Sequence, residues 1–213
     1  MAQVLRVDPD HPATEAVERA CAVLAAGELL VYPTDTLYAL GGRALDEAAV
    51  ARVRRLKGRG QAKPLPLVVA DLIQARSLSR DWGAKAERLS SAFWPGPLTL
   101  VVPAAAAVPD GIVAGGRSVA VRVPASVLVR SLCRSQGPLV STSANLAGAD
   151  PPGTCAEALA GVGAGVALAL DGGPGGPTAS TVVDLTGRSP RLVRAGAVAW
   201  EAVQEVWFRG SCC

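Results

Sequence analysis

Histidine is nearly absent from this chain, and aromatic residues are few. The only histidine among 213 residues is His11, which leaves no credible Ser-His-Asp triad or histidine-based metal site. Aromatic residues make up 4% of a chain that is 50% hydrophobic, so the core must consist mainly of valine, leucine and alanine. The five cysteines include no CxxC pair, which argues against a structural zinc site.

The sequence also lacks targeting signals and familiar nucleotide motifs. It shows neither a signal-peptide pattern at its start nor an apolar run long enough to span a membrane, and its cysteine count is odd, so we expect a cytoplasmic protein. GxxxxGK[ST], GxGxxG after a strand, HExxH and GxSxG do not occur. Any catalysis must therefore depend on positioning and electrostatics. The net charge of +3 permits an anionic partner without requiring nucleic acid.

Hydrophobic periodicity predicts alternating helices and strands in the first half of the chain and mainly strands after that. Helices are expected at 13–26, 46–56, 82–93, 125–135, 154–159 and 198–207. Strands are expected at 28–32, 65–70, 97–103, 118–123, 138–141, 166–171, 180–185 and 191–194. This order predicts a single α/β domain with a twisted mixed β-sheet and flanking helices. The Gly- and Pro-rich loop 172–178 is expected to be mobile.

Two polar segments follow predicted apolar elements early in the chain. Thr34-Asp35-Thr36 comes after a strand and is either a simple turn or a hydroxyl and backbone cup for a small polar ligand. Lys57, Arg59 and Lys63 follow a helix whose first residue is expected to be capped by Asp46. These three cations form either a solvated basic face or a cradle for a triphosphate.

Later in the chain, two further features suggest ligand contacts. Ser141-Thr142-Ser143-Ala144-Asn145 follows an apolar strand and either caps a helix or binds an anion and a nucleoside edge at that helix start. Arg122 alternates with valines in a strand, and Arg194 ends another strand. A cation in apolar surroundings requires either a structural ion pair or a ligand carboxylate.

In their order, these segments resemble the YrdC-like threonylcarbamoyl-adenylate synthase family. The matching motifs are Tyr-Pro-Thr-Asp-Thr, Lys-Gly-Arg with Lys-Pro-Leu, Trp-Pro-Gly-Pro-Leu-Thr, Val-Ala-Val-Arg-Val-Pro, Ser-Ala-Asn, Ser-Thr-Val-Val-Asp and Val-Arg-Ala-Gly. The resemblance covers 4–207, the short single-domain form, and leaves 208–213 as a tail expected to be disordered. It implies a YrdC-like fold around a large basic cavity.

The resemblance also implies an activity and its site. L-Threonine, bicarbonate or CO2, and ATP would give threonylcarbamoyl-AMP and pyrophosphate, and a tRNA threonylcarbamoyltransferase complex would use the product beside the anticodon. Mg²⁺ would bind the ATP phosphates without a protein cage, no covalent nucleophile is implied, and tRNA binding would be weak. Threonine would be bound by Thr36, Arg122, Ser141, Thr142 and Ser180. ATP would be bound by Lys57, Arg59, Lys63, Ser118, Ser143, Asn145 and Arg194, with Lys57 and Arg59 giving electrostatic catalysis.

Three positions depart from the family pattern, and two other functions compete with the synthase. Ala39 replaces a usual glycine, Gly60 replaces a frequent proline, and Val68 replaces a histidine that helps to hold threonine in many members. The loss of that histidine is expected to weaken threonine binding or alter selectivity. The competing functions are a non-catalytic RNA-binding module that uses the basic cavity, and a related carbamoyl-adenylate chemistry.

Overall fold

The chain forms two mixed β-sheets with helices around them, in a computed structural model that describes residues 2–58, 63–146 and 148–209. The helices are α1 (Thr14–Ala25), α2 (Glu47–Leu56), α3 (Leu72–Ser77), α4 (Gly83–Phe93), α5 (Asp110–Val113), α6 (Val127–Gln136), α7 (Cys155–Val162), the 3₁₀ turn η1 (Gly163–Gly165) and α8 (Trp200–Phe208). The strands are β1 (Gln3–Arg6), β2 (Leu30–Pro33), β3 (Tyr38–Gly41), β4 (Leu67–Val68), β5 (Leu98–Pro103), β6 (Ser118–Arg122), β7 (Leu139–Val140), β8 (Thr142–Ser143), β9 (Leu168–Asp171), β10 (Thr181–Asp184) and β11 (Arg191–Arg194).

The strands divide between the two sheets in the orders β1-β9-β2-β3-β8 and β11-β10-β5-β6-β4-β7. In the first sheet β9 runs parallel to β1 and β2, whereas β3 is antiparallel to β2 and β8. In the second, β5/β10 and β4/β6 are parallel pairs, and the remaining pairs are antiparallel. The predicted mixed α/β architecture with flanking helices is confirmed, but the strands form two sheets where one was expected.

The two sheets meet where the chain passes from β7 to β8. Ser141 is the single residue between these strands, and each strand belongs to a different sheet. Val140 binds both sides of this junction: its N–H donates to Gly42 O at 2.9 Å, and its carbonyl accepts from the Tyr32 hydroxyl at 2.9 Å. Ser141 N–H donates to Pro66 O at 2.8 Å. The junction therefore ties the β2–β3 hairpin to the segment that leads into β4.

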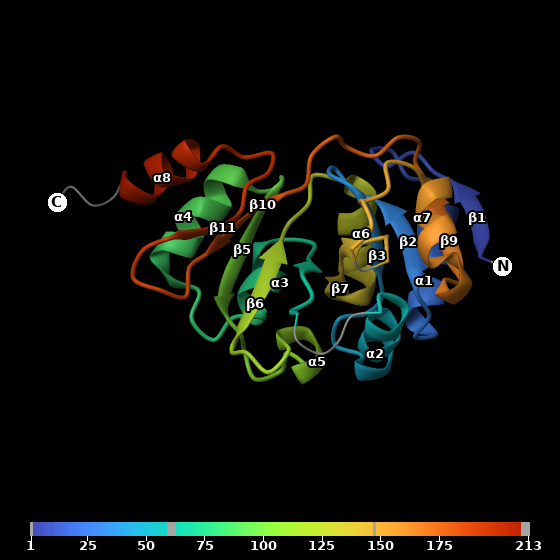
Figure 1. The fold of residues 1–213 in the computed structure, drawn as a ribbon, viewed down its shortest axis with the longest axis horizontal. Helices are drawn as coiled ribbons and strands as arrows, with labels where there is room; N and C mark the ends of the chain where they lie inside the picture. Colours follow the sequence, from blue (N-terminus) through green and yellow to red (C-terminus); the bar gives the residue numbers. More distant parts are fainter. Residues whose placement is uncertain (1, 59–62, 147, 210–213) are drawn as a thin grey trace.

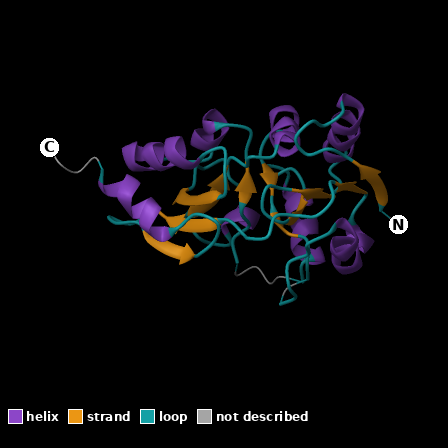
Figure 2. Ribbon diagram, turned by 90° about the horizontal axis from the view of Figure 1, so that it is seen from above, coloured by secondary structure: helices purple, strands orange, loops and turns teal. Residues whose placement is uncertain are grey.

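Helices cover the outer faces of the sheets at both ends of the molecule (Figure 1). Helix α1 packs against α6 beside the first sheet, whereas α4 packs against α8 beside the second. Helix α2 begins as predicted, because the Asp46 carboxylate accepts hydrogen bonds from the N–H groups of Ala48 and Ala49. Strand β1 and helix α8, the first and last elements, lie at opposite ends of the molecule (Figure 1), and Figure 2 shows the fold from above.

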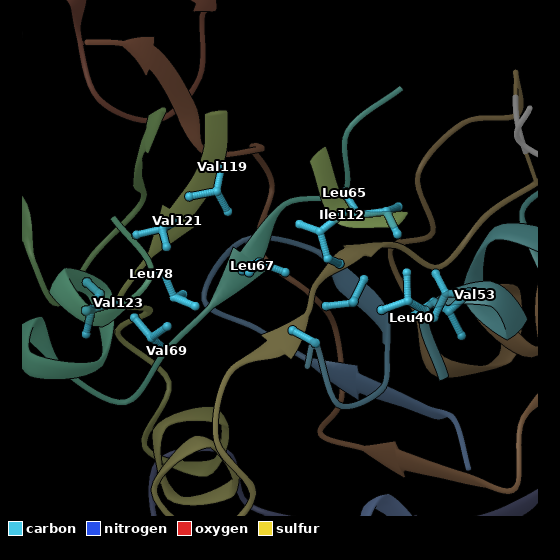
Figure 3. Packing of buried hydrophobic residues seen from close by; sticks show 14 of the residues in the cluster. Leu40, Val53, Leu65, Leu67, Val69, Leu78, Ile112, Val119, Val121 and Val123 are labelled. Atoms are coloured by element: carbon cyan, nitrogen blue, oxygen red, sulfur yellow. The ribbon is translucent and has the colours of Figure 1, made fainter. Parts of the chain in front are cut away.

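Valine, leucine and alanine dominate the core, as the composition predicts. One cluster extends through both sheets and includes Leu40, Val53, Leu67 and Val121, all buried (Figure 3). A second cluster lies under α1 and α6 and includes Leu24 and Leu132. Burying branched apolar side chains from both sheets in shared clusters holds the sheets together.

Several short elements were not predicted. They are β1, β3, β8, α3 and α5, each of which has at most six residues. The expected strand at 65–70 shortens to Leu67–Val68. Helix α8 includes Phe208, and 210–213, most of the predicted tail, lie outside the described residues. None of the helices in the described part of the chain is both long and apolar enough to cross a membrane.

The junction should not tolerate a side chain at Gly41. A Cβ atom there would lie 2.2 Å from Val140 O and 2.8 Å from the Tyr32 hydroxyl oxygen, and neither atom can retreat without breaking their hydrogen bond. Gly41→Ala is expected to lower the free energy of unfolding by about 1–3 kcal/mol. In Gly161→Ala the new Cβ would make only ordinary contacts, 3.6 Å or longer. Denaturant unfolding of both variants checks this, and equal stability would contradict it.

Candidate active site

A tight polar turn joins β2 to β3 and carries the first group of predicted site residues. The Thr34 hydroxyl organises it: Oγ1 accepts from the N–H groups of Thr36 and Leu37, both at 3.1 Å, and donates to Leu37 O at 2.7 Å. Thr34 and Thr36 are both buried, and their hydroxyl oxygens lie 2.9 Å apart. The turn therefore presents a fixed pair of hydroxyls with Asp35 between them.

Arg122, at the end of β6, extends its guanidinium to this turn. Its Nη1 donates to both Asp35 carboxylate oxygens at 3.0 and 3.1 Å, and its Nη2 donates to Thr36 Oγ1 at 3.3 Å. The side chain of Arg122 is 6% exposed and that of Asp35 is 15% exposed. Burial lowers the pKa of Arg122, whereas the charge of Asp35 raises it. Of the two alternatives left open for this cation, the structure contains the ion pair.

A second arginine binds a neighbouring strand end. Arg194 Nη2 donates to Ser180 O at 2.7 Å and to Ser180 Oγ at 2.9 Å, and Nε donates to the same carbonyl at 3.1 Å. The Ser180 hydroxyl also lies 2.9 Å from Thr99 Oγ1. Unlike Arg122, Arg194 is exposed and forms no ion pair among the described residues. Partial burial lowers the pKa of Arg194, and the charge of Arg122 lowers it further. Thr99 lies on β5, which pairs with the β6 strand that carries Arg122, so the two arginines lie at neighbouring strand ends.

Two other positions adjoin Arg122. Val68 is its register partner in the parallel pairing of β4 with β6, so the departure from the family pattern lies directly beside the guanidinium-bearing residue. Burial raises the pKa of Tyr32, and hydrogen bonding to Ser141 and the charge of Arg122 partly offset this rise. Ser141 therefore lies near Tyr32, whereas Thr142 is buried in β8 opposite Leu40.

Lys57 forms a separate group with the segment after β8. It is fully buried, and its ammonium donates to Ser143 O at 2.6 Å, to Asn145 Oδ1 at 2.8 Å and to Asn145 O. Ser143 Oγ donates to the same Asn145 Oδ1 at 2.6 Å. The structure thus brings three predicted ATP ligands together. An ammonium has three N–H donors, so contact with a phosphate would require an exchange of partners here.

The expectation that a helix starts at Ser143 to Asn145 is wrong. Within the described part of this segment, 144–146 and 148–150, no residue is helical, and α7 begins only at Cys155. The side chains that were expected to cap a helix bind elsewhere, since Ser143 Oγ and Asn145 Oδ1 interact with each other and with Lys57. Helix N–H groups for an anion are therefore not available at this place.

The remaining predicted site residues are dispersed. Ser118 starts β6 and lies four residues before Arg122 on the same face of the strand. Lys63 is exposed, and its carbonyl accepts from Arg54 Nη2 at 3.1 Å. Arg59 and Gly60 lie outside the described residues. The ligand contacts assigned to all these side chains stay predictions.

The hollows of the described residues lie away from the predicted site residues. Two hollows, of about 330 and 630 Å³, lie at the α4–β10 side and between α2 and α5, and neither is lined by a predicted site residue. The large basic cavity therefore stays a prediction. No cluster of three or more His, Cys, Asp or Glu side chains suited to a metal ion occurs in the ranges that the structure describes.

Sequence reasoning missed three residues that build the site. Asp35 was treated only as a turn residue, although a buried arginine requires a partner and the neighbouring polar turn supplies one. Tyr32 and Thr99 are predicted only as strand residues, and their polar contacts come from elements far away in the sequence.

The glycines after β9 also indicate a close contact with the site. Tyr38 OH donates to Gly173 O at 2.6 Å, and a Cβ on Gly176 would lie 2.6 Å from Thr36 O, so the loop expected to be mobile packs against the turn.

The chain is similar to several known proteins. The family model Sua5/YciO/YrdC, described as telomere recombination, matches residues 22–196. A protein of Mycobacterium tuberculosis is 37% identical over 200 residues, which are 93% of this chain and 92% of that protein. The protein of Pyrococcus abyssi named threonylcarbamoyl-AMP synthase is 38% identical over 182 residues, which are 84% of this chain and 54% of that protein.

Solved structures agree with these relatives. The crystal structure of P. abyssi Sua5 complexed with L-threonine matches 95% of this chain and 60% of its own, with a TM-score of 0.91 and 35% identity. The crystal structure of E. coli YciO matches 93% of this chain and 98% of its own, with a TM-score of 0.86 and 29% identity. The architecture described above is therefore that of proteins with related sequences.

The Lys57 group makes a prediction about stability. Lys57→Met keeps the length and apolar stem of the side chain but removes the ammonium that the part-buried oxygens of Ser143 and Asn145 accept from. We expect the free energy of unfolding to fall by about 2 kcal/mol or more. Lys85→Met is the control, because Lys85 is exposed and contacts only the ring of Trp207 among the interactions described for it, which is worth about 1 kcal/mol or less. Equal losses in denaturant unfolding would contradict a structural role for Lys57.

Proposed function

Because this chain belongs to the Sua5/YciO/YrdC family, we propose that it is an L-threonylcarbamoyladenylate synthase, a nucleotidyltransferase. Its substrates are L-threonine, bicarbonate or CO2, and ATP, and its products are threonylcarbamoyl-AMP and pyrophosphate. The observation that carries the proposal is the meeting of Arg122 with Thr36 and of Arg194 with Ser180 at neighbouring strand ends. The family relationship and the threonine complex of the Pyrococcus relative support it.

The threonine half of the site is the Arg122 side. A guanidinium binds a carboxylate through two parallel N–H groups, and a buried guanidinium does so strongly because it has little competing water. Thr36 and Ser180 offer hydroxyls beside Arg122 and Arg194, and Ser141 lies next to Tyr32. Val68 provides no hydrogen bond to threonine, and so Arg122 and the hydroxyls must supply the affinity.

The ATP half is the basic loop with the neighbouring strand ends. The assigned ligands that are at least partly accessible are Lys63, Ser118, Ser143, Asn145 and Arg194. The buried Lys57 holds the segment of Ser143 and Asn145 through its hydrogen bonds. Arg59 is assigned to the triphosphate from its motif. Since the described residues offer no carboxylate cage, Mg²⁺ is assigned to the phosphate oxygens, where it offsets their charge. Magnesium thus belongs to the nucleotide in this proposal.

Positioning and charge account for the reaction. The threonine amine adds to CO2 and loses a proton, which gives a carbamate. A carbamate oxygen then attacks the α-phosphorus and pyrophosphate leaves. The two reacting partners are both anions and repel each other, and the cations of this chain hold them together and stabilise the charge that develops in the transition state. No covalent intermediate with the protein is required.

The product is a reactive mixed anhydride, and a further protein must use it. We assign that step to a tRNA threonylcarbamoyltransferase complex, with only weak binding of tRNA by this chain and a location in the cytoplasm. The net charge of +3 fits such a weak contact. The competing function is a non-catalytic RNA-binding module, and the pyrophosphate-release assay distinguishes it from the synthase.

Pyrophosphate release from ATP tests the activity directly. We expect release only when threonine and bicarbonate are both present, and we expect a chelator of divalent cations to abolish it. Release without threonine would mean that another acceptor is used. No release, together with salt-sensitive binding of RNA, would replace the synthase by the RNA-binding module.

Arg122→Ala tests the assignment of the two halves. Loss of the buried guanidinium should raise the KM for threonine by roughly tenfold or more, with the KM for ATP little changed. Arg191→Ala is the control, because Arg191 also pairs with an aspartate but is 74% exposed, compared with 6% for the side chain of Arg122. A rise in the KM for ATP without a change in that for threonine would reverse the assignment.

A further inference from the structure

Asp35 is the more accessible member of the buried ion pair. Its side chain is 15% exposed, whereas that of Arg122 is 6% exposed. One N–H nitrogen of Arg122, Nη1, contacts both carboxylate oxygens. A carboxylate can accept about four hydrogen bonds, so Asp35 keeps acceptor capacity on its outer side while it holds the guanidinium.

The backbone that carries the carboxylate is also held in place. The Thr34 hydroxyl binds the N–H groups of Thr36 and Leu37 and closes the turn. On the other side the backbone of Gly176 packs on the turn, where a Cβ would lie 2.8 Å from Asp35 O and 2.6 Å from Thr36 O. Asp35 is therefore a preorganised anion at the edge of the site.

The charges around Asp35 are unequal. Arg122 and Arg194 are close enough for the charge of one to lower the pKa of the other. In the described ranges, Asp35 is the only acidic side chain paired with either of them. This arrangement of two cations and one anion leaves one positive charge that an α-carboxylate can offset, and it leaves Asp35 as the acceptor for a cation that arrives with that carboxylate.

We propose that Asp35 is a specificity-determining residue that accepts a hydrogen bond from the α-ammonium of the amino-acid substrate while Arg122 holds its α-carboxylate. The inference rests on the proposed function and adds a selection rule to it. Arg122 alone would bind any small carboxylate, whereas the Arg122–Asp35 pair favours a zwitterion. The carbamate nitrogen keeps one N–H, so Asp35 can hold the same atom after the amine has reacted.

The test compares two ligands that differ in the amine alone. L-Threonine and 3-hydroxybutanoate, which is threonine with hydrogen in place of the amine, are titrated by calorimetry into the full chain and into Asp35→Asn. The asparagine keeps the shape and one acceptor oxygen but loses the charge. We expect Asp35→Asn to weaken threonine binding by roughly tenfold or more, with the affinity for 3-hydroxybutanoate unchanged or higher. Asp35→Glu should recover part of the preference for threonine.

Asp184→Asn is the matched control. Asp184 also pairs with an arginine, and its side chain is likewise 15% exposed, but its partner Arg191 lies on β11 away from the turn. This variant should keep both affinities. Thermal unfolding of every variant shows whether it is folded before binding is compared.

Each outcome of the binding comparison decides whether Asp35 selects the amine of the substrate or only pairs with Arg122. Equal weakening of both ligands in Asp35→Asn, or no change in either, would reduce Asp35 to a structural counter-ion of Arg122 and overturn the inference while the proposed function stands. If the unaltered chain binds no threonine and releases no pyrophosphate, the proposed function fails and the inference fails with it.

Discussion

The site depends on one buried charge, the Arg122 guanidinium at the end of β6. A guanidinium that is removed from water must be paired, because an unpaired buried charge is far costlier than an unpaired polar group. The β2–β3 turn supplies the partner through Asp35 and Thr36, and the two elements belong to different sheets. The pair therefore fixes how the sheets meet and places a cation where a small anion can be bound.

The strand junction at Ser141 makes this meeting possible. Because β7 and β8 are separated by a single residue, the strand that pairs with β4 in one sheet continues as the strand that pairs with β3 in the other. At this junction Gly41 lies so close to Val140 O and the Tyr32 hydroxyl that no space is left for a side chain on Gly41. This close packing holds the turn that carries Asp35 next to the end of β6.

Residue patterns predicted much of the fold but only part of the site. The boundaries of α1, α2 and β5 followed from periodicity and caps, which are local properties of the chain. Arg122 stood out because a cation between valines demands an explanation. Its partner could not be chosen from the sequence, because Asp35 lies 87 residues away and nothing local distinguishes it from an ordinary turn residue. Lys57 was assigned to a ligand because its motif is basic, yet its burial against Ser143 and Asn145 depends on tertiary packing alone.

The contrast between Lys57 and the two arginines suggests how one scaffold can handle two anions. Lys57 directs its ammonium to carbonyl and amide oxygens of the protein and so holds the segment after β8 in place. Arg122 is paired with the Asp35 carboxylate, and Arg194 binds only neutral oxygens of Ser180 among the described contacts. A guanidinium that binds neutral oxygens has no anion to offset its charge, which suits Arg194 for the phosphates of ATP. Structural and ligand-binding cations are thus separated by the partners that the fold gives them, and their positions along the chain do not show this difference.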